Sequence, residues 1–380
     1  MTIGTEHEFS INDLHFNPLS ESDRIIRTIC GSYENEIAFG SVKLGKELQK
    51  TVLEFVPRNP SLTLAGLERQ LVSGIAKFNA MFRGRYALLG LGMHPTLRLD
   101  QAAVWDHGEG EYYEAYDRLF TIRQHGWLNI QALQINLSYN SEDDLVSLYN
   151  RTRQILPFLV AVTAASPIVE DKCTDVMDNR LLFYRENQKE IPSICNRIIP
   201  EEIRSVREYH QSQEMVFSEL RARDAGILCE EWLNSAGMII RFSRRCLEIK
   251  ALDEQECIRS DMAVCAFAQS LLRCRKLDLP TERDTLLSLL EEAVRHGTSA
   301  FRPELERLYA LSWDHATPDE LQYLPLIHSR IIRGSLAELI RGSAEEGTST
   351  ASLLPVLSGC LSENRPFSGL SREGTEKTAC

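Results

Sequence analysis

The sequence predicts an α+β fold in which an antiparallel β-sheet is backed by helices. Three observations carry this prediction. Apolar and polar residues alternate with the period of a β-strand at 2–11, 130–138 and 246–253. Apolar residues recur at helical spacing between these segments and throughout 281–342. The two kinds of segment do not follow a strict βαβα order, which favours an antiparallel sheet over a doubly wound parallel one.

The first half of the chain opens with a strand, because Ile3, Thr5 and His7 alternate with Glu6 and Glu8. The same two periods predict the elements that follow it. They are a helix at 22–32, a strand at 51–56, a helix at 61–83, a buried strand at 86–92 and a helix at 111–125.

The second half alternates again at 130–138, and Ser141 then caps a helix that runs through Ala165. Further on, the sequence predicts a loop at 166–200, a mostly helical region at 201–234, a strand at 246–253, a helix at 260–277 and helices over 281–342. We expect a single domain over 1–345 and a flexible tail over 346–380, where Gly, Ser, Thr and Glu surround a small apolar patch.

Composition narrows the class of protein. The 380 residues include 54 acidic and 42 basic side chains, a formal net charge of -12, which argues against a general nucleic-acid binder. The ten cysteines show no CxxC spacing and indicate reduced thiols. No apolar run reaches the roughly 18–20 residues of a membrane span. We therefore expect a cytoplasmic protein that does not contact membranes, and the oligomeric state, a homo-oligomer included, is left open.

Pairs of polar residues occupy four of the strand-like segments. The pairs are Glu6 with Glu8, Gln134 with Asn136, Glu248 with Lys250, and Glu47 with Glu54. For any single pair, the more frequent explanation is that the two side chains lie on a sheet face exposed to solvent. Asn and Glu are nevertheless depleted from strands unless their surroundings favour them. One sheet that carries all four segments would gather four or five carboxylates on one face.

Carboxylates that gather in this way repel one another and raise each other's pKa unless a cation neutralises them. An oxygen-rich cluster without Cys or His pairs suits Mg²⁺ or Mn²⁺ better than Zn²⁺. Basic residues are available as charge partners for phosphates: Arg180, Arg241, Arg244, Arg245 and Lys250. The residues thus suggest a site for Mg²⁺ and a nucleotide that transfers a phosphoryl group. The basic run 241–245 also fits a plain surface cluster.

Five blocks, in this order, carry a resemblance to a known family. They are GTEHEF at 4–9, ELQKTVLE at 47–54, QALQINL at 131–137 followed by Ser141-Glu142, AASP at 164–167 with Arg180 downstream, and LEIK at 247–250 with Asp253. Together they resemble the second type of glutamate–cysteine ligase and the wider carboxylate–amine ligase family. The resemblance covers about residues 1–275, and the helical part to 345 would extend the same domain.

The resemblance implies a glutamine-synthetase-like fold, in which the antiparallel sheet forms a funnel. It also implies an ATP- and Mg²⁺-dependent ligase that forms carbon–nitrogen bonds, with Mn²⁺ as an alternative metal. ATP would phosphorylate the γ-carboxylate of glutamate, and an amine such as cysteine would attack the acyl phosphate, as in glutathione biosynthesis. Small molecules would be its partners: an amino acid, an amine and ATP.

Site residues are carried over onto the matching positions. The metal ligands would be Glu6, Glu8, Glu47, Glu54 and Glu248. The residues that contact substrate or nucleotide would be Gln134, Asn136 and Arg241, and the charged groups that serve catalysis would be Arg180, Arg245 and Lys250. Lys250 stands where the family usually has Arg, so a bidentate contact becomes a point charge. Residues 168–175 lack the commoner glycine-bearing loop, which leaves the acceptor amine open.

Two other functions are compatible with these residues. A metal-dependent hydrolase would use the same carboxylates to activate water. A degenerate family member would bind glutamate or nucleotide and act as a regulator. The presence of all five carboxylates favours a catalyst, because clustered carboxylates without a use would only destabilise the fold.

Overall fold

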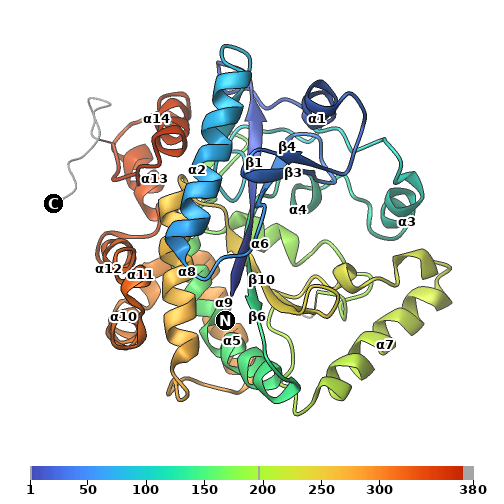
Figure 1. The fold of residues 1–380 in the computed structure, drawn as a ribbon, viewed down its shortest axis with the longest axis vertical. Coiled ribbons are helices and arrows are strands. Elements are labelled where there is room, and N and C mark those ends of the chain that lie inside the picture. The colour runs from blue at the N-terminus through green and yellow to red at the C-terminus, as the bar shows by residue number, and fades with distance from the viewer. Residues whose placement is uncertain (1, 196, 371–380) are drawn as a thin grey trace.

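An antiparallel sheet runs through the centre of the computed structural model, which describes residues 2–195 and 197–370 (Figure 1). Within these residues eight strands form the sheet in the order β2-β3-β4-β1-β6-β10-β9, and β5 pairs with β1 at one end. The strands of this sheet are β1 Ile3–Asn12, β2 Glu36–Phe39, β3 Val42–Lys46, β4 Val52–Pro57, β5 Ala87–Leu89, β6 Ala132–Ser138, β9 Met238–Arg241 and β10 Cys246–Asp253. A separate two-stranded ribbon joins β7 Ile168–Val169 to β8 Lys172–Cys173.

Helices make up most of the remaining chain. In the first half they are α1 Ser22–Cys30, α2 Leu64–Met81, α3 Gly110–Phe120, α4 His125–Leu128, α5 Glu142–Thr163 and α6 Asn179–Tyr184. In the second half they are α7 Val206–Ala222, α8 Ile258–Arg273, α9 Arg283–His296, α10 Arg302–His315, α11 Pro318–Leu321, α12 Leu324–Arg333, α13 Leu336–Glu345 and α14 Thr350–Glu363. Short 3₁₀ turns are η1 Gly226–Leu228, η2 Glu231–Leu233 and η3 Gly297–Ala300.

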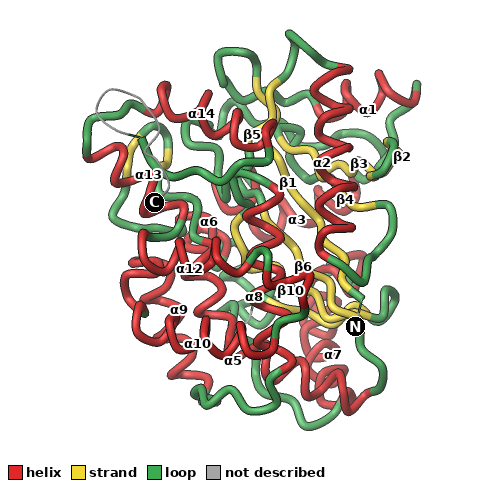
Figure 2. Tube along the Cα trace, turned by 60° about the vertical axis from the view of Figure 1, so that its left-hand side comes forward, coloured by secondary structure: helices red, strands yellow, loops and turns green. Residues whose placement is uncertain are grey.

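One face of the sheet is apolar and is covered by helices. Phe9 of β1, Ile135 of β6 and Ile249 of β10 are fully buried in the main core, together with residues of α2, α5 and α8. These three helices lie along the same side of the sheet, and α9 to α13 extend the layer outwards (Figure 1, Figure 2). The period-two pattern explains this arrangement, because alternate side chains of each strand point into that layer. The other face is left to the polar residues.

The predicted strands and helices are largely present, and the structure adds others. The sequence did not predict β2, β3 or β9, because each is only four or five residues long and contains or adjoins a glycine. The predicted loop 166–200 also contains the β7–β8 ribbon and α6. The region 201–234 is helical only in α7, after which the chain continues in the turns η1 and η2. Ser141 caps α5 as expected, and its hydroxyl accepts a hydrogen bond from the Asp144 amide at 3.1 Å.

The prediction of a flexible tail from residue 346 is wrong for 350–370. Residues 350–363 form α14, which buries Leu353, Leu354 and Leu357 in a second hydrophobic cluster with Leu89 of β5. The amide of Phe367 donates to the buried Glu256 Oε1 at 2.8 Å. The polar composition concealed an apolar stripe whose partners lie far away in the sequence. The remaining part of the predicted tail, 371–380, lies outside the described residues.

In the described part of the chain, no helix combines the length and the apolar character that crossing a lipid bilayer requires. The nine cysteines among these residues are all free thiols.

A candidate active site on the polar face of the sheet

The register of the central strands brings the predicted polar residues onto one face. Glu6 lies opposite Gln134 on β6, Glu8 lies opposite Glu54 on β4, and Glu248 lies opposite Asn136. Residues directly opposite one another in an antiparallel pair point to the same side of the sheet. Six polar side chains from four strands therefore share the face opposite the layer of α2, α5 and α8.

The two amides of β6 orient two of the carboxylates. Gln134 Nε2 donates a hydrogen bond to Glu8 Oε1 at 3.0 Å, and the amide of Ala132 donates to Glu8 Oε2 at 2.9 Å. Asn136 Nδ2 donates to Glu6 Oε1 at 3.0 Å. Gln134 and Asn136 thus fix where the carboxylate oxygens of β1 point.

Glu54 and Glu47 complete the carboxylate cluster from the neighbouring strands. The Glu54 carboxyl hydrogen-bonds to that of Glu6, and it lies over Gly45 of β3, where an added Cβ would be only 2.5 Å from Glu54 Oε2. Glycine at this position therefore makes room for the Glu54 side chain. Glu47 follows directly after β3 and is half-buried beside the same face.

Burial and mutual repulsion shift the pKa values of the cluster. Burial raises the pKa of Glu8 to about 7, although a hydrogen bond from the Ala132 amide and the charge of Arg180 oppose it. Burial and the Glu8 charge raise the pKa of Glu47 to about 8. Burial and the Glu6 charge hold the pKa of Glu54 well above its usual value. The cluster therefore favours bound protons or a bound cation.

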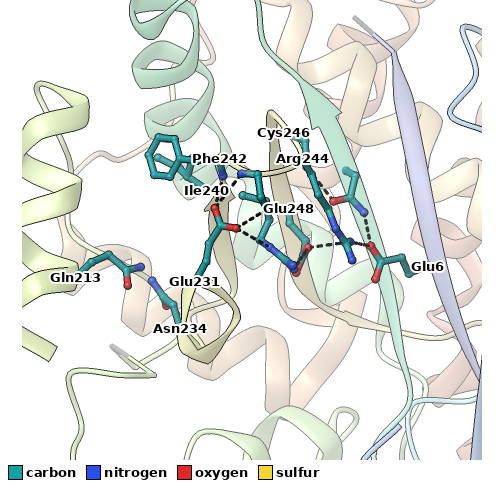
Figure 3. A network of polar contacts seen from close by, with 12 residues as sticks. Glu6, Gln213, Glu231, Asn234, Ile240, Phe242, Arg244, Cys246 and Glu248 are labelled. Atoms are coloured by element: carbon teal, nitrogen blue, oxygen red, sulfur yellow. Dashed lines mark hydrogen bonds and ion pairs between the residues drawn. The ribbon is translucent and has the colours of Figure 1, made fainter. Parts of the chain in front are cut away.

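An arginine at the end of β9 and one in the turn that leads to β10 neutralise the far side of the cluster (Figure 3). Arg241 Nη1 donates to Glu248 Oε2 at 2.8 Å, and Arg244 forms a hydrogen bond and ion pair with Glu6. Burial alone would raise the pKa of Glu6, but the Arg244 guanidinium lowers it. Arg245, for which a charge role was expected, is exposed on the same turn in the left-handed backbone region, with φ +53.

Lys250 and Arg180 approach the cluster from its other side. Lys250 lies at a bulge of β10, since Ile249 pairs with Ile135 and Leu252 with Leu133. Its charge lowers the pKa of both Glu8 and Glu47. Arg180 of α6 is buried, and its Nε donates to Asp253 Oδ1 at 2.6 Å. Arg180 thus acts on Glu8 through its charge, while it donates a hydrogen bond to Asp253.

A buried charged group supports the sheet directly behind the cluster. His7 Nδ1 lies 3.2 Å from Glu254 Oε1 and 3.4 Å from Asp261 Oδ2, and Glu254 Oε2 accepts the amide of Glu8 at 3.3 Å. Burial opposes the charge of His7, but Glu254 and Asp261 raise the pKa of His7 to about 10. A protonated His7 therefore supplies the positive charge that these two acids need.

Two cavities flank the carboxylate cluster and share Glu6, Glu54 and Arg244 in their linings. The smaller, of about 410 Å³, contains basic side chains, namely Lys43, Arg58, Arg244 and Arg245. The larger, of about 540 Å³, has aromatic walls, namely Tyr112, Tyr113, Tyr116, Trp127 and Trp232. Sequence reasoning missed these aromatic residues. Three tyrosines at helical spacing in the predicted helix 111–125 were a signal, but the tryptophans come from two other segments.

The chemistry of the donor set fits a divalent cation, although within the part of the chain that the structure describes no three of these carboxylates bring oxygen atoms within 4.8 Å of one another, as His7, Glu254 and Asp261 do. The donor set consists of oxygen ligands, which Mg²⁺ and Mn²⁺ prefer. Glu248 Oε1 is buried and has no hydrogen-bond partner among the described residues. An orphaned, buried carboxylate oxygen beside other acids is the kind of atom that a bound cation would satisfy.

Comparison with known proteins places the chain in a family. A family model described as glutamate-cysteine ligase family 2 (GCS2) matches residues 2–319. The chain belongs to this family. The GCS2 family consists of ATP-dependent carboxylate–amine ligases. An uncharacterized protein of Archaeoglobus fulgidus is 48% identical over 367 residues, which cover 96% of this chain and 100% of that protein.

Solved structures confirm the predicted glutamine-synthetase-like α+β fold. A glutamate–cysteine ligase from Francisella tularensis in complex with AMP is similar with a TM-score of 0.68 at 11% identity, covering 96% of this chain and 88% of that chain. A bifunctional glutathione synthetase from Pasteurella multocida is similar with a TM-score of 0.66 at 15% identity, and the match covers 96% of this chain and 52% of that longer one. At these identities the likeness establishes the fold of this GCS2 chain.

Proposed function

We propose that this GCS2 chain is an ATP- and Mg²⁺-dependent ligase that activates the γ-carboxylate of glutamate as an acyl phosphate and joins it to an amine such as cysteine. One observation carries the proposal: carboxylates with raised pKa values and arginine side chains meet on one sheet face between two cavities. Acidic metal ligands next to basic phosphate ligands are what phosphoryl transfer requires.

The carboxylates proposed to hold Mg²⁺, or Mn²⁺ in its place, are Glu6, Glu8, Glu47, Glu54 and Glu248. When bound, the metal neutralises charge on the phosphates. Gln134 and Asn136 keep Glu8 and Glu6 oriented through hydrogen bonds of 3.0 Å. Gln134 lines the larger cavity and Asn136 the smaller one, where they are proposed to contact nucleotide or substrate. The amides thus support the proposed metal ligands and extend the polar face towards the ligands.

The basic residues are proposed to stabilise negative charge on the transferring phosphoryl group and on the substrate carboxylate. Arg241 and Arg244 already contact the cluster, Arg245 lies at the mouth of the smaller cavity, and Lys250 reaches the cluster from β10. Arg180 keeps Asp253 in place at the end of the same strand. Cations held in this way need little rearrangement during the reaction, and this is where most of the rate enhancement of such enzymes arises.

The aromatic walls of the larger cavity serve the second half of the proposed reaction. An acyl phosphate reacts with water unless water is excluded, so its attack by an amine benefits from a low-polarity enclosure. Tyr112 and Trp232 line one part of this cavity with ring centroids 5.8 Å apart, while charged side chains such as Lys46 and Glu109 line another. We propose that the rings limit the access of water to the acyl phosphate and so favour ligation over hydrolysis.

The test is an ADP-release assay with Mg²⁺, ATP, glutamate and a panel of amines that includes cysteine. The proposal expects ADP release that requires both glutamate and one of the amines, with the amide product detected by mass spectrometry. A metal-dependent hydrolase would turn over without ATP, and a regulator would bind ligand without turnover. Either result would replace the proposal.

A further inference from the structure

Glu231 lies outside the sheet, in the short turn η2, and holds the turn between β9 and β10 (Figure 3). Glu231 Oε1 accepts hydrogen bonds from the amide of Phe242 and, at 3.3 Å, from the amide of Ser243. Glu231 Oε2 accepts the Ser243 hydroxyl at 2.7 Å and lies 3.7 Å from Arg241 Nε. One half-buried carboxylate therefore binds three groups of the turn and approaches the arginine that precedes it.

β9 is an edge strand, so its outward amides have no neighbouring strand to bind. The Tyr209 hydroxyl of α7 accepts the amide of Ile240 at 3.1 Å, and Glu231 accepts that of Phe242, two residues further on. Tyr209 is itself oriented by Gln213, whose Nε2 donates to its hydroxyl at 3.0 Å. Tyr209 thus caps the strand, whereas Glu231 caps the turn.

The end of β9 and the turn after it carry the two arginines that neutralise the carboxylate cluster: Arg241 is the last residue of β9, and Arg244 lies in the turn. Arg241 binds Glu248 at 2.8 Å, and Arg244 pairs with Glu6 and lies 3.9 Å from Glu248. The Arg244 side chain is 49% exposed, so little packing fixes it apart from these ion pairs. The direction in which its guanidinium points therefore depends on the backbone of the turn.

Glu231 is also anchored to the wall of the larger cavity. The next residue, Trp232, packs against Tyr112 and Tyr116 of α3 with ring centroids 5.8 and 6.1 Å apart. The carboxylate thus connects the aromatic cavity on one side to the arginine turn on the other.

We propose that Glu231 is a positioning residue of the proposed ligase reaction: it locks the 241–246 turn so that Arg241 and Arg244 stay directed at Glu248 and Glu6. The catalytic part of this inference rests on the proposed function. In this inference the guanidinium groups and a divalent cation compete for the negative charge of the same two carboxylates, Glu6 and Glu248. Glu231 therefore favours correct placement of the arginines at the expense of metal affinity.

The test compares Glu231→Ala with Glu230→Ala, a matched control whose side chain is exposed one residue earlier. In Glu231→Ala, hydrogen exchange at Phe242 and Ser243 should rise by about tenfold, because two amides lose their acceptor. Mn²⁺, titrated into the purified protein, should bind about threefold more tightly, since the competing ion pair of the half-exposed Arg244 with Glu6 is weak and now less constrained. Turnover should nevertheless fall by about ten- to a hundredfold with the KM for ATP nearly unchanged.

Tighter metal binding combined with slower turnover is a signature that a merely structural role would not produce. Glu231→Gln keeps one acceptor oxygen and should restore part of the turnover, while Glu230→Ala should match the parent. Tyr209→Phe removes the acceptor of the Ile240 amide and of the Gln213 and Asn234 side chains but leaves Glu231 in place, so it should lower the unfolding temperature without changing Mn²⁺ affinity.

Unchanged exchange at Phe242 and Ser243 would overturn the inference. Mn²⁺ binding that weakens in step with thermal stability would also overturn it, because Glu231 would then only support the fold. If the parent protein shows no ATP-dependent ligation, the proposed function is wrong and turnover can no longer be compared between the variants. The exchange and Mn²⁺ measurements would still decide whether Glu231 directs the arginines.

Discussion

At the scale of single residues, the ionised carboxylate of Glu54 is destabilised in the folded protein unless a cation binds beside it. Burial and the neighbouring Glu6 and Glu47 charges hold its pKa well above the usual value. In Glu54→Gln we expect unchanged or higher thermal stability in a chelator, because a neutral amide relieves this repulsion. ADP release should fall by about a hundredfold or more if Glu54 holds the metal that the phosphates need.

Thermal unfolding in EDTA and a coupled ADP assay measure the two effects. Glu306→Gln, an exposed residue of α10 with the same change of charge, is the control and should behave like the parent. Unaltered ATP-dependent turnover in Glu54→Gln would remove Glu54 from the proposed ligand set.

The raised pKa values of Glu8 and Glu47 predict how the metal-free protein responds to pH. Both carboxyls, with pKa values of about 7 and about 8, keep their protons in the folded state, whereas unfolded carboxyls release them near the ordinary 4.5. Between about pH 4.5 and about pH 8 the folded state therefore binds more protons than the unfolded state. The stability of the folded state falls as the pH rises through this range. His7, with a pKa of about 10, stays charged throughout this window.

Unfolding temperatures measured in EDTA across this pH range should decline, and saturating Mg²⁺ should reduce the decline because a cation replaces the protons. A flat profile in EDTA would show that the carboxyls are solvated or compensated and would contradict the buried cluster.

At the scale of elements, the β3–β4 pair depends on a glycine. An alanine Cβ at position 45 would come within 2.5 Å of Glu54 Oε2, so Gly45→Ala must displace that carboxylate. We expect ATP-dependent turnover to fall by about tenfold or more, because small misplacements of a catalytic constellation are costly, while the protein remains folded.

The control is Gly359→Ala in α14, where an added Cβ meets nothing within 4 Å. It should raise stability by about 0.5–1 kcal/mol, since Gly is a poor helix former, without changing turnover. Equal turnover in the two variants would show that Glu54 does not need its present position.

At the scale of the whole molecule, α14 completes the hydrophobic core. Leu357 is 1% exposed and packs in the second cluster with residues of β5 and α13. We expect Leu357→Ala to lower the free energy of unfolding by about 2–4 kcal/mol through the cavity it leaves. Leu62→Ala, at a residue that is 79% exposed, should change it by less than about 0.5 kcal/mol.

Chemical denaturation measures both variants. A small effect of Leu357→Ala would indicate that α14 detaches from the body of the protein, as the predicted flexible tail would have required.

Local periodicity was enough to assign several site residues to a sheet face. Glu6 and Glu8, two residues apart on one strand, must point to the same side, and the same holds for Gln134 and Asn136. Periodicity did not tell which strands are neighbours, so the contact between Glu6 and Glu54 and the pairing of Glu8 with Glu54 could not be derived.

The basic run at 241–245 shows where local pattern is insufficient. All three arginines were available as charge partners, but the turn directs Arg241 and Arg244 into the cluster and leaves Arg245 outside it. The positive φ of Arg245 is a property of the closed hairpin and not of its sequence neighbours. The role of Glu231 was invisible for the same reason, because the edge of β9 exists only once the sheet has formed.

The sequence by itself determined the fold class, the family and the faces on which the carboxylates lie, because these follow from short periods and ordered motifs. Only the tertiary structure revealed the aromatic cavity, the direction of the arginines around the β9–β10 turn and the burial of α14. Each of these joins segments that are far apart in the chain, and their proximity is set by strand register and core packing. The pKa shifts belong with them, because burial and neighbouring charges exist only in the folded protein.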